Sequence, residues 1–305
     1  MVGVIDIGSN SIKILVAAKA ADGRVVARKL RTIEARIGTG ISAEKPHLTT
    51  EGIERGVAAV AELAVEASAF TPDKIIVVAT SAVRDAENGA EFCRRVKAVT
   101  QLDVRILSGD EEAALIGRGL LCDPGLSKER DFYVFDLGGG SLECLAFRDR
   151  KVVQEASLPL GCVRLSEKFV TDTAAPYRPE IGTALAAHVR AIVTAANFSL
   201  ANPGVAVGTG GTLTAVRAIL AARLSKVTEE IPPVLTTRQL REMLDQIGSL
   251  PLSERLKVPG LPPGRADVFP AALATLIALA DLGAFEAYRH SFYNLRWGLA
   301  AEALE

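Results

Sequence analysis

The chain has 305 residues, of which 49% are hydrophobic and 23% charged, and its formal net charge is −1. That much apolar sequence predicts an ordinary globular protein with one large or two medium domains. Aromatic residues make up only 5%, which favours the many small contacts of an α/β fold over an all-β sandwich. Because there is no basic surplus, nucleic acid is not an expected partner, and any polyanion must be bound by a local site.

Cysteine and histidine usage argues against a zinc site or a disulfide framework. The cysteines have no CxxC spacing and no histidine cluster near them, so buried reduced thiols are expected. The histidines are scattered and expected on surfaces, which disfavours a histidine nucleophile. These residues are Cys93, Cys122, Cys144 and Cys162, and His47, His188 and His290.

No targeting or membrane segment is evident in the sequence. The start of the chain lacks the basic segment, long apolar run and cleavage site of an export signal. The most apolar stretch, residues 271–280, is too short to span a membrane and suits a core helix. A cytoplasmic location without a membrane partner is therefore expected.

In the first half of the chain, apolar patterns and turn residues predict alternating strands and helices. A strand ends at Asp6, and a returning strand follows a tight turn. The alternation that comes next implies parallel pairing. The predicted elements after the turn are strands 12–17 and 25–30, a helix 50–69 capped by Thr50, strand 74–79, helix 88–100, strand 104–107 and helix 110–121.

Turn formers and charges over residues 122–131 mark a break, after which the plan repeats. The four prolines of residues 251–263 predict a loop that wraps a surface rather than a core element. Pro203-Gly204 predicts a sharp entry into a strand. The predicted elements of this half are a strand ending at Asp136, strands 142–147 and 152–158, helix 179–200, strand 205–207, a glycine turn 208–211 and a helix starting near Thr212.

An internal repeat is the most informative feature. Val4-Ile-Asp-Ile-Gly-Ser-Asn-Ser11 aligns without gaps to Val134-Phe-Asp-Leu-Gly-Gly-Gly-Ser141. Each copy has an apolar strand, an acid, a small-residue turn and a second apolar strand, so each is predicted to be a β-hairpin.

The two turns have the composition of phosphate cradles. Glycine permits backbone N–H groups to converge on an oxyanion, and Gly208-Thr-Gly-Gly-Thr212 adds a third such segment. A tight turn without a ligand is the ordinary alternative for any one copy. The predicted phosphate-binding residues are Gly8, Ser9, Asn10, Ser11, Gly138, Gly139, Gly140, Ser141, Gly208, Gly210, Gly211 and Thr212.

Taken together, the motifs closely resemble the Ppx/GppA phosphatase family, the exopolyphosphatases and guanosine pentaphosphate phosphohydrolases. The resemblance spans nearly the whole chain, in its short two-domain form. It rests on both hairpin motifs, on Gly208-Thr-Gly-Gly-Thr212, and on Ala79-Thr-Ser-Ala-Val-Arg-Asp-Ala86, Ser108-Gly-Asp-Glu-Glu-Ala-Ala-Leu115 and Leu295-Arg-Trp-Gly298.

The resemblance implies the superfamily of actin, heat-shock chaperones and sugar kinases. The expected fold is α/β, with duplicated ribonuclease-H-like (actin-like ATPase) domains and an interdomain cleft. The domains would comprise residues 1–121 and 122–305, with a C-terminal helix at about 290–305 that could pack back on the first domain.

The resemblance also implies roles for individual residues. Glu112 aligns with the proposed general base, and Asp136 would hold Mg²⁺ with Asp6 opposite. Glu143 would assist the metal or the water, and Arg84, expected on a loop, would clamp a phosphate. Each has an ordinary alternative: helix-dipole acids for Glu112, a solvent-facing hairpin acid for Glu143, and a surface ion pair for Arg84.

The implied activity is hydrolysis of the terminal phosphoanhydride bond of inorganic polyphosphate, with Mg²⁺ and water activated by Glu112. Guanosine pentaphosphate hydrolysis is the enzymatic alternative, and a non-catalytic sensor of guanosine tetraphosphate is a second. A sugar-kinase-like phosphotransferase lacks an evident acceptor motif. Homodimer formation is left as an open alternative.

Overall fold

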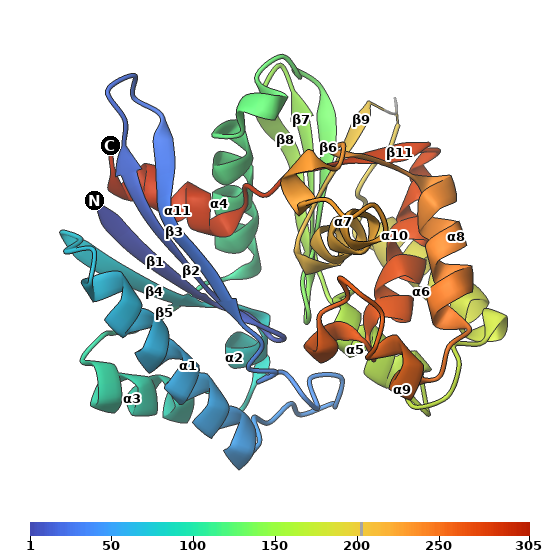
Figure 1. Cartoon of the computed structure of the whole chain (residues 1–305), viewed down its shortest axis with the longest axis horizontal. Coiled ribbons are helices and arrows are strands. Elements are labelled where there is room, and N and C mark those ends of the chain that lie inside the picture. Colours follow the sequence, from blue (N-terminus) through green and yellow to red (C-terminus); the bar gives the residue numbers. More distant parts are fainter. Residues whose placement is uncertain (202–203) are drawn as a thin grey trace. The chain divides into compact units, whose positions relative to one another are not determined.

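The computed structural model describes residues 1–201 and 204–305, so Pro203 of the predicted sharp entry lies outside the described residues. The chain divides into two compact units, Met1–Ser127 with Tyr293–Glu305, and Lys128–Phe292. The predicted boundary after residue 121 lies slightly earlier in the chain, and the C-terminal segment is counted here with unit 1. Figure 1 labels the elements of both units.

Unit 1 is built on a mixed five-stranded sheet in the order β3-β2-β1-β4-β5. β2 runs antiparallel to its neighbours β1 and β3, whereas β4 is parallel to both β1 and β5. Every residue of β1 is buried, because helices cover both faces of the sheet at its centre. The strands are β1 (Val2–Ile7), β2 (Ile12–Lys19), β3 (Val25–Ile33), β4 (Lys74–Ala79) and β5 (Val104–Ile106).

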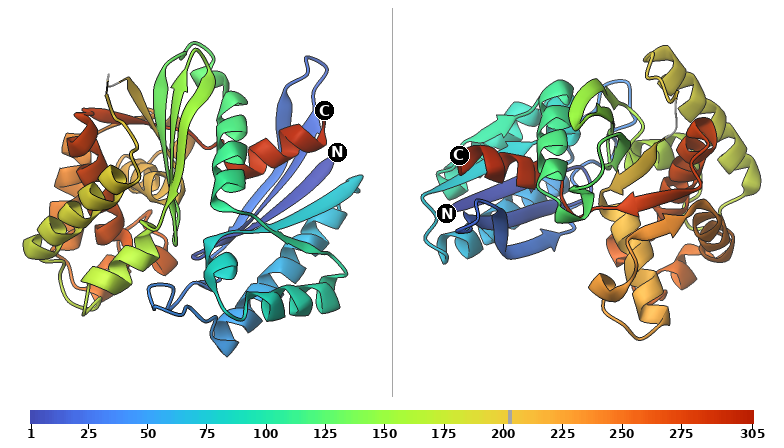
Figure 2. Two further views of the ribbon diagram at one scale, coloured as in Figure 1. Left: turned by 180° about the vertical axis from the view of Figure 1, so that it is seen from behind. Right: turned by 90° about the horizontal axis from the view of Figure 1, so that it is seen from above.

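Helices α1 and α3 cover one face of this sheet, and α4 and α11 pack together on the other (Figures 1 and 2). Thr49 rather than Thr50 caps α1, since its hydroxyl accepts from Gly52 N. A Cβ at Gly119 or Gly298 would collide with the facing backbone, which explains the close approach of α4 and α11. The helices are α1 (Thr50–Ser68), α2 (Ser81–Asp85), α3 (Gly89–Thr100), α4 (Gly109–Leu121), the 3₁₀ turn η1 (Pro124–Leu126) and α11 (Leu295–Ala303).

Unit 2 has a six-stranded sheet in the order β10-β11-β9-β6-β7-β8. β6 pairs antiparallel with β7 and parallel with β9, and β9 pairs parallel with β11. The rings of Phe132 and Phe147 stack across β6 and β7 with centroids 4.3 Å apart. The strands are β6 (Phe132–Leu137), β7 (Leu142–Arg148), β8 (Lys151–Leu158), β9 (Val205–Thr209), β10 (Val234–Thr236) and β11 (Ala287–His290).

The apolar stretch around residues 271–280 lies inside α10 (Phe269–Gly283), which is buried almost all round and contacts α5, α6, α7 and α8. This confirms the predicted core helix. The other helices are α5 (Cys162–Phe169), α6 (Pro179–Ala195), α7 (Gly211–Arg223), α8 (Thr237–Gly248) and α9 (Leu252–Arg255), with 3₁₀ turns η2 (Thr228–Glu230) and η3 (Pro263–Arg265). Within the part of the chain that is described, no helix is long and apolar enough to cross a bilayer.

The two sheets repeat one plan. In both units the first strand pairs with an antiparallel second and a parallel fourth, and the second and third strands carry a register shift at the corresponding place, Val16/Ala17 and Ala146/Phe147. Both tight turns close through the same bond, Gly8 N to Ser11 O at 3.2 Å and Gly138 N to Ser141 O at 3.1 Å. The predicted α/β fold with duplicated ribonuclease-H-like domains is confirmed.

Besides the cap of α1, two local expectations were wrong. Arg84 lies on the short helix α2 rather than on a loop. His290 is buried, because it ends β11 beneath Arg217, which donates to its ring. Most of residues 251–263 lie at the surface, as predicted, but Arg255 within them is buried and donates to the carbonyls of Thr173, Ala175 and Ala266.

Candidate phosphate-binding and catalytic site

Loop 1, residues 6–11, follows β1 and is braced from behind by the segment that continues β3. Ser9 O accepts from Gly38 N at 2.8 Å and Asn10 O accepts from Arg36 N at 2.9 Å. A Cβ at Gly38 would lie 2.6 Å from Ser9 Cβ, so only glycine fits at this close approach. Arg36 adopts a left-handed conformation, with φ of 48°, to make its contact.

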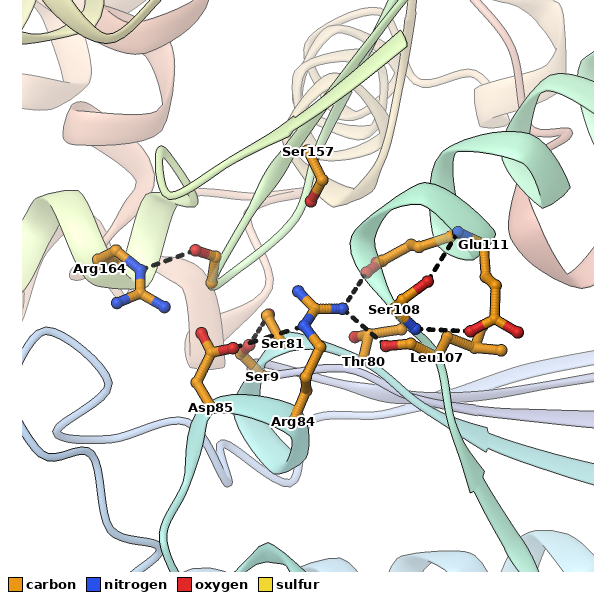
Figure 3. Close-up of polar contacts among 12 residues, drawn as sticks. Ser9, Thr80, Ser81, Arg84, Asp85, Leu107, Ser108, Glu111, Ser157 and Arg164 are labelled. Atoms are coloured by element: carbon orange, nitrogen blue, oxygen red, sulfur yellow. Dashed lines mark hydrogen bonds and ion pairs between the residues drawn. The ribbon is translucent and has the colours of Figure 1, made fainter. Parts of the chain in front are cut away.

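Loop 2, residues 136–141, is braced by the first turn of α5 instead. The first N–H groups of a helix have no partner inside it, and here the loop carbonyls accept them. Arg164 adds its side chain, which lies beside the loop in Figure 3. The bonds are Cys162 N to Gly138 O at 2.9 Å, Val163 N and Arg164 N to Gly139 O at 2.8 and 3.2 Å, and Arg164 Nε to Gly140 O at 2.9 Å.

The hydrogen bonds from α5 determine the direction in which the amides of loop 2 point. In a trans peptide the N–H lies opposite the preceding C=O, so a carbonyl that faces α5 turns the next N–H away from α5. The N–H groups of Gly139, Gly140 and Ser141 are therefore all directed to the other side of loop 2. Among residues 1–201 and 204–305 no partner is recorded for these three N–H groups. Consecutive amides arranged in this way form an anion-binding nest.

In loop 1 the same reasoning directs two amides, those of Asn10 and Ser11, away from the bracing segment. The Asn10 side chain is also notable, because its amide N and O are both buried and neither has a hydrogen-bond partner in the described chain. Buried polar groups are normally satisfied, so an unpaired amide marks a place for a ligand or water. Ser9 Oγ lies 3.1 Å from Ser81 Oγ and so links loop 1 to α2 (Figure 3).

The acids of the two loops have opposite neighbours. In the β6–β7 ladder Asp136 stands directly across from Glu143, whereas in the β1–β2 ladder Asp6 stands across from Lys13. Facing residues of an antiparallel pair present their side chains on one face, about 5 Å apart at Cβ. Unit 2 therefore places two acidic side chains beside loop 2, whereas in unit 1 Lys13 offsets the charge of Asp6. Glu143 is 1% exposed and accepts from Ser157 Oγ at 2.9 Å.

The third glycine segment adjoins Asp136. Thr209 pairs with Asp136 in the β6–β9 ladder, and Gly210 follows in a conformation with φ of 97°. A Cβ at Gly210 would lie 2.8 Å from Asp136 Oδ1, so glycine permits the close passage. The hydroxyls of Thr209 and Thr212 are buried without a hydrogen-bond partner among the described residues. These hydroxyls are suited to meet ligand oxygens or water.

Sequence reasoning missed Arg265, which η3 places against Gly211. A Cβ at Gly211 would overlap the Arg265 guanidinium, and Arg265 is largely buried. It lies just after residues 251–263, for which a surface loop was expected. The one available signal was an arginine beside a proline-rich segment, which is too weak to single it out.

In unit 1 the predicted base and clamp contact each other. Arg84 NH1 donates to Glu112 Oε2 at 3.0 Å and to Leu107 O at 3.0 Å (Figure 3). Thr80 N donates to Ile7 O, which holds the start of α2 at the carboxyl end of β1. Glu112, in the first turn of α4, is buried, whereas Glu111 is exposed.

Ser108 is the N-cap of α4, so the helix begins slightly earlier than the predicted start at residue 110. The Ser108 hydroxyl accepts from Glu111 N, and Ser108 N donates to the Glu111 carboxylate, which also accepts from Arg105. These bonds lower the pKa of Glu111 to about 2. Glu112, the next residue, is not part of this capping box. Arg296 also has a structural contact, since NH1 donates to Ile14 O.

Magnesium is compatible with the donors of unit 2. Mg²⁺ uses one or two carboxylates together with substrate phosphates and water, so a cage of protein ligands is not required. In the described residues no group of three or more His, Cys, Asp and Glu side chains could hold a metal ion. The adjacent carboxylates of Asp136 and Glu143 supply hard oxygen ligands of the kind that Mg²⁺ prefers.

Known proteins resemble this chain over nearly its whole length. An exopolyphosphatase from Cytophaga hutchinsonii gives a TM-score of 0.88 at 23% identity, with 99% of this chain and 97% of that chain covered. A PPX-GPPA enzyme of Aquifex aeolicus gives a TM-score of 0.79 at 26% identity, with 99% and 98% covered. The model of the Ppx/GppA phosphatase family matches residues 15–305. Because this match covers nearly the whole chain, the protein belongs to the Ppx/GppA phosphatase family.

Proposed function

We propose that the protein is an exopolyphosphatase that uses Mg²⁺ to hydrolyse the terminal phosphoanhydride bond of inorganic polyphosphate. The observation that carries the proposal is the set of amides of Gly139, Gly140 and Ser141, turned to one side of loop 2 by the bonds to α5. Such a nest binds phosphate oxygens without selecting a base or a sugar. The solved exopolyphosphatase that shares the fold agrees with this substrate class.

The proposal assigns a chemical role to each predicted catalytic residue. Glu112 takes a proton from water, whose oxygen forms a bond to the terminal phosphorus while the bridging P–O bond breaks. The shortened chain leaves with the electron pair on its phosphate oxygen. Asp136, with Glu143 beside it, would hold Mg²⁺, which neutralises phosphate charge when bound. The sequence also assigns Asp6 to the metal, but Lys13 opposite makes Asp6 the weaker ligand.

Arg84 has two roles in this proposal. In the free protein it orients Glu112 through the 3.0 Å bond. In the complex its planar guanidinium would meet the phosphate and stabilise charge in the transition state. A phosphate anion therefore competes with Glu112 for Arg84, which releases the carboxylate to accept a proton.

The test is phosphate release with Mg²⁺, with long polyphosphate, tripolyphosphate and guanosine pentaphosphate supplied side by side. We expect release from polyphosphate, and we expect Glu112→Gln to lower kcat by about 10²- to 10⁴-fold, the range for a general base. Glu111→Gln is the matched control, since it changes the neighbouring, exposed acid and retains a side chain suited to the cap. No release from any substrate would refute the enzyme proposal.

Guanosine pentaphosphate remains the second candidate. The largely buried Arg265 guanidinium beside Gly211 supplies a planar cation next to the third glycine segment, where a nucleotide group could stack. Preferential release from guanosine pentaphosphate, with no release from tripolyphosphate, would favour this candidate. Tight binding of guanosine tetraphosphate without any phosphate release would instead identify a sensor.

A further inference from the structure

Gly161 precedes α5 and lies against the backbone of loop 2. Its φ of −65° is open to any residue, so backbone strain does not require glycine there. Space does. A Cβ at Gly161 would collide with the backbone atoms of Gly139 and Gly140, which cannot turn aside as a side chain could.

We propose that Gly161 and Arg164 are positioning residues of the phosphoanhydride reaction, which hold loop 2 so that its three amides address one phosphate group. The inference rests on the proposed function. Gly161 lets the first turn of α5 approach the loop, and its absent Cβ leaves Cys162 N and Val163 N within 2.9 Å of the carbonyls. Arg164 Nε fixes the last carbonyl, that of Gly140, and thereby the direction of the Ser141 amide.

The arrangement in unit 1 supports this interpretation independently. There Gly38 also approaches loop 1 too closely for a Cβ, which would lie 2.6 Å from Ser9 Cβ, although Gly38 belongs to an irregular segment rather than to a helix start. Two unrelated local structures thus use a glycine to bring N–H donors onto the carbonyl side of the equivalent turn. A shared requirement of the turns, with their amides facing a ligand, explains the coincidence better than local packing does.

Two variants of unit 2 test the proposal by different physical routes. Gly161→Ala pushes loop 2 away from α5, and Arg164→Lys keeps the positive charge but removes the Nε donor. Gly182→Ala is the control, because its Cβ meets only Tyr177, at 3.7 Å from Cε1 and 3.8 Å from the hydroxyl oxygen. We expect kcat/KM for tripolyphosphate to fall at least tenfold in Gly161→Ala and about threefold to tenfold in Arg164→Lys, since oxyanion donors depend on position. The control should match the wild type.

A second readout does not depend on turnover. Titration of inorganic phosphate, followed by the ¹H–¹⁵N resonances of Gly139, Gly140 and Ser141, should shift these amides in the wild type and in Gly182→Ala. The shifts should be at least halved in both positioning variants. A purely structural role would lower the thermal midpoint and leave the shifts of the folded fraction intact.

The outcomes separate the two proposals. If the wild type releases no phosphate but the amides shift and depend on Arg164, the positioning of loop 2 for phosphate binding holds and the exopolyphosphatase proposal fails. If the wild type is active and Arg164→Lys keeps both its kcat/KM and its amide shifts, the positioning is refuted, even where Gly161→Ala does not fold. Amides that do not shift in the wild type refute it as well.

Discussion

Loop 1 and loop 2 share a backbone but differ in charge and in what holds them. Both begin with an aspartate, close through a glycine and end with a serine. Loop 1 has Lys13 across from its aspartate and carries side chains at Ser9 and Asn10, whereas loop 2 has Glu143 and two glycines. Duplication preserved the turn, because the turn presents the amides. The side chains diverged, which suits loop 2 to a cation and a reacting phosphate and loop 1 to a neighbouring group.

The largest effect expected from this comparison is at the two aspartates. Asp136→Asn should lower kcat by about 10³-fold and raise the Mg²⁺ concentration for half-maximal activity, because it removes a proposed metal ligand. Asp6→Asn should lower kcat by about tenfold, since Lys13 already balances the charge of Asp6. Magnesium titrations of both variants provide the measurement. Equal losses at the two positions would contradict the assignment of the metal to unit 2.

Gly210 should be the next most sensitive position. Alanine there must adopt a φ of 97° and place its Cβ 2.7 Å from Leu137 O. We expect a loss of about 1–3 kcal/mol in the free energy of unfolding, the usual cost of such backbone strain, and a fall in kcat as Asp136 is displaced. Denaturant melts and phosphate release report the two effects. Gly8→Ala in loop 1, whose Cβ meets only Ser11 O at 3.1 Å, should be the milder substitution.

Asn10 tests whether the side chains of loop 1 contact the substrate. Its counterpart in loop 2 is Gly140, so Asn10→Gly makes the loops more alike and removes a buried, unpaired amide. Stability should change by less than about 1 kcal/mol, because the relief of an unpaired polar group offsets the added chain entropy. If Asn10 contacts the phosphate chain, KM should rise about tenfold, in line with a charged hydrogen bond. An unchanged KM would limit loop 1 to backbone contacts.

The sequence predicted the duplicated fold because its signals are local. Alternating apolar residues, turn glycines and the repeated motif each act within a few neighbours, so the order of elements and both hairpins were recoverable. The cap of α1 was misplaced by one residue, since Thr49 and Thr50 are both good N-caps and only the backbone angles distinguish them.

What escaped prediction depends on contacts distant in the sequence. The approach of Arg265 to Gly211 and the burial of His290 under Arg217 join segments from different parts of unit 2. The bracing of loop 2 was equally hidden, because nothing in the residues around Gly161 shows that they would meet residues 138–140. The glycine pattern identified the cradles, but the direction of their amides required the structure.

The smallest predicted effect is a difference in acid sensitivity between the units. Burial and the nearby Arg217 guanidinium lower the pKa of His290 to about 3, so in the folded state it stays neutral, accepts from Arg217 and lies 3.3 Å from Thr214 Oγ1. Unfolded, it takes up a proton below its ordinary pKa of 6.5, so the stability of unit 2 is greatest above that pH and declines as the pH falls toward 3. In unit 1, the lowered pKa of Glu111 confines the corresponding loss of stability to pH values below its ordinary pKa of 4.5.

Hydrogen exchange at pH 7 and at about pH 5.5 should therefore show unit 2 destabilised by on the order of 1 kcal/mol, whereas these groups should leave the stability of unit 1 unchanged. His290→Asn, which keeps an acceptor for Arg217, should reduce the difference to the share of His188, whose pKa burial also lowers, while His47→Asn, at an exposed histidine of unit 1, should preserve it. Equal sensitivity of both units in the wild type would show that His290 does not control the acid response.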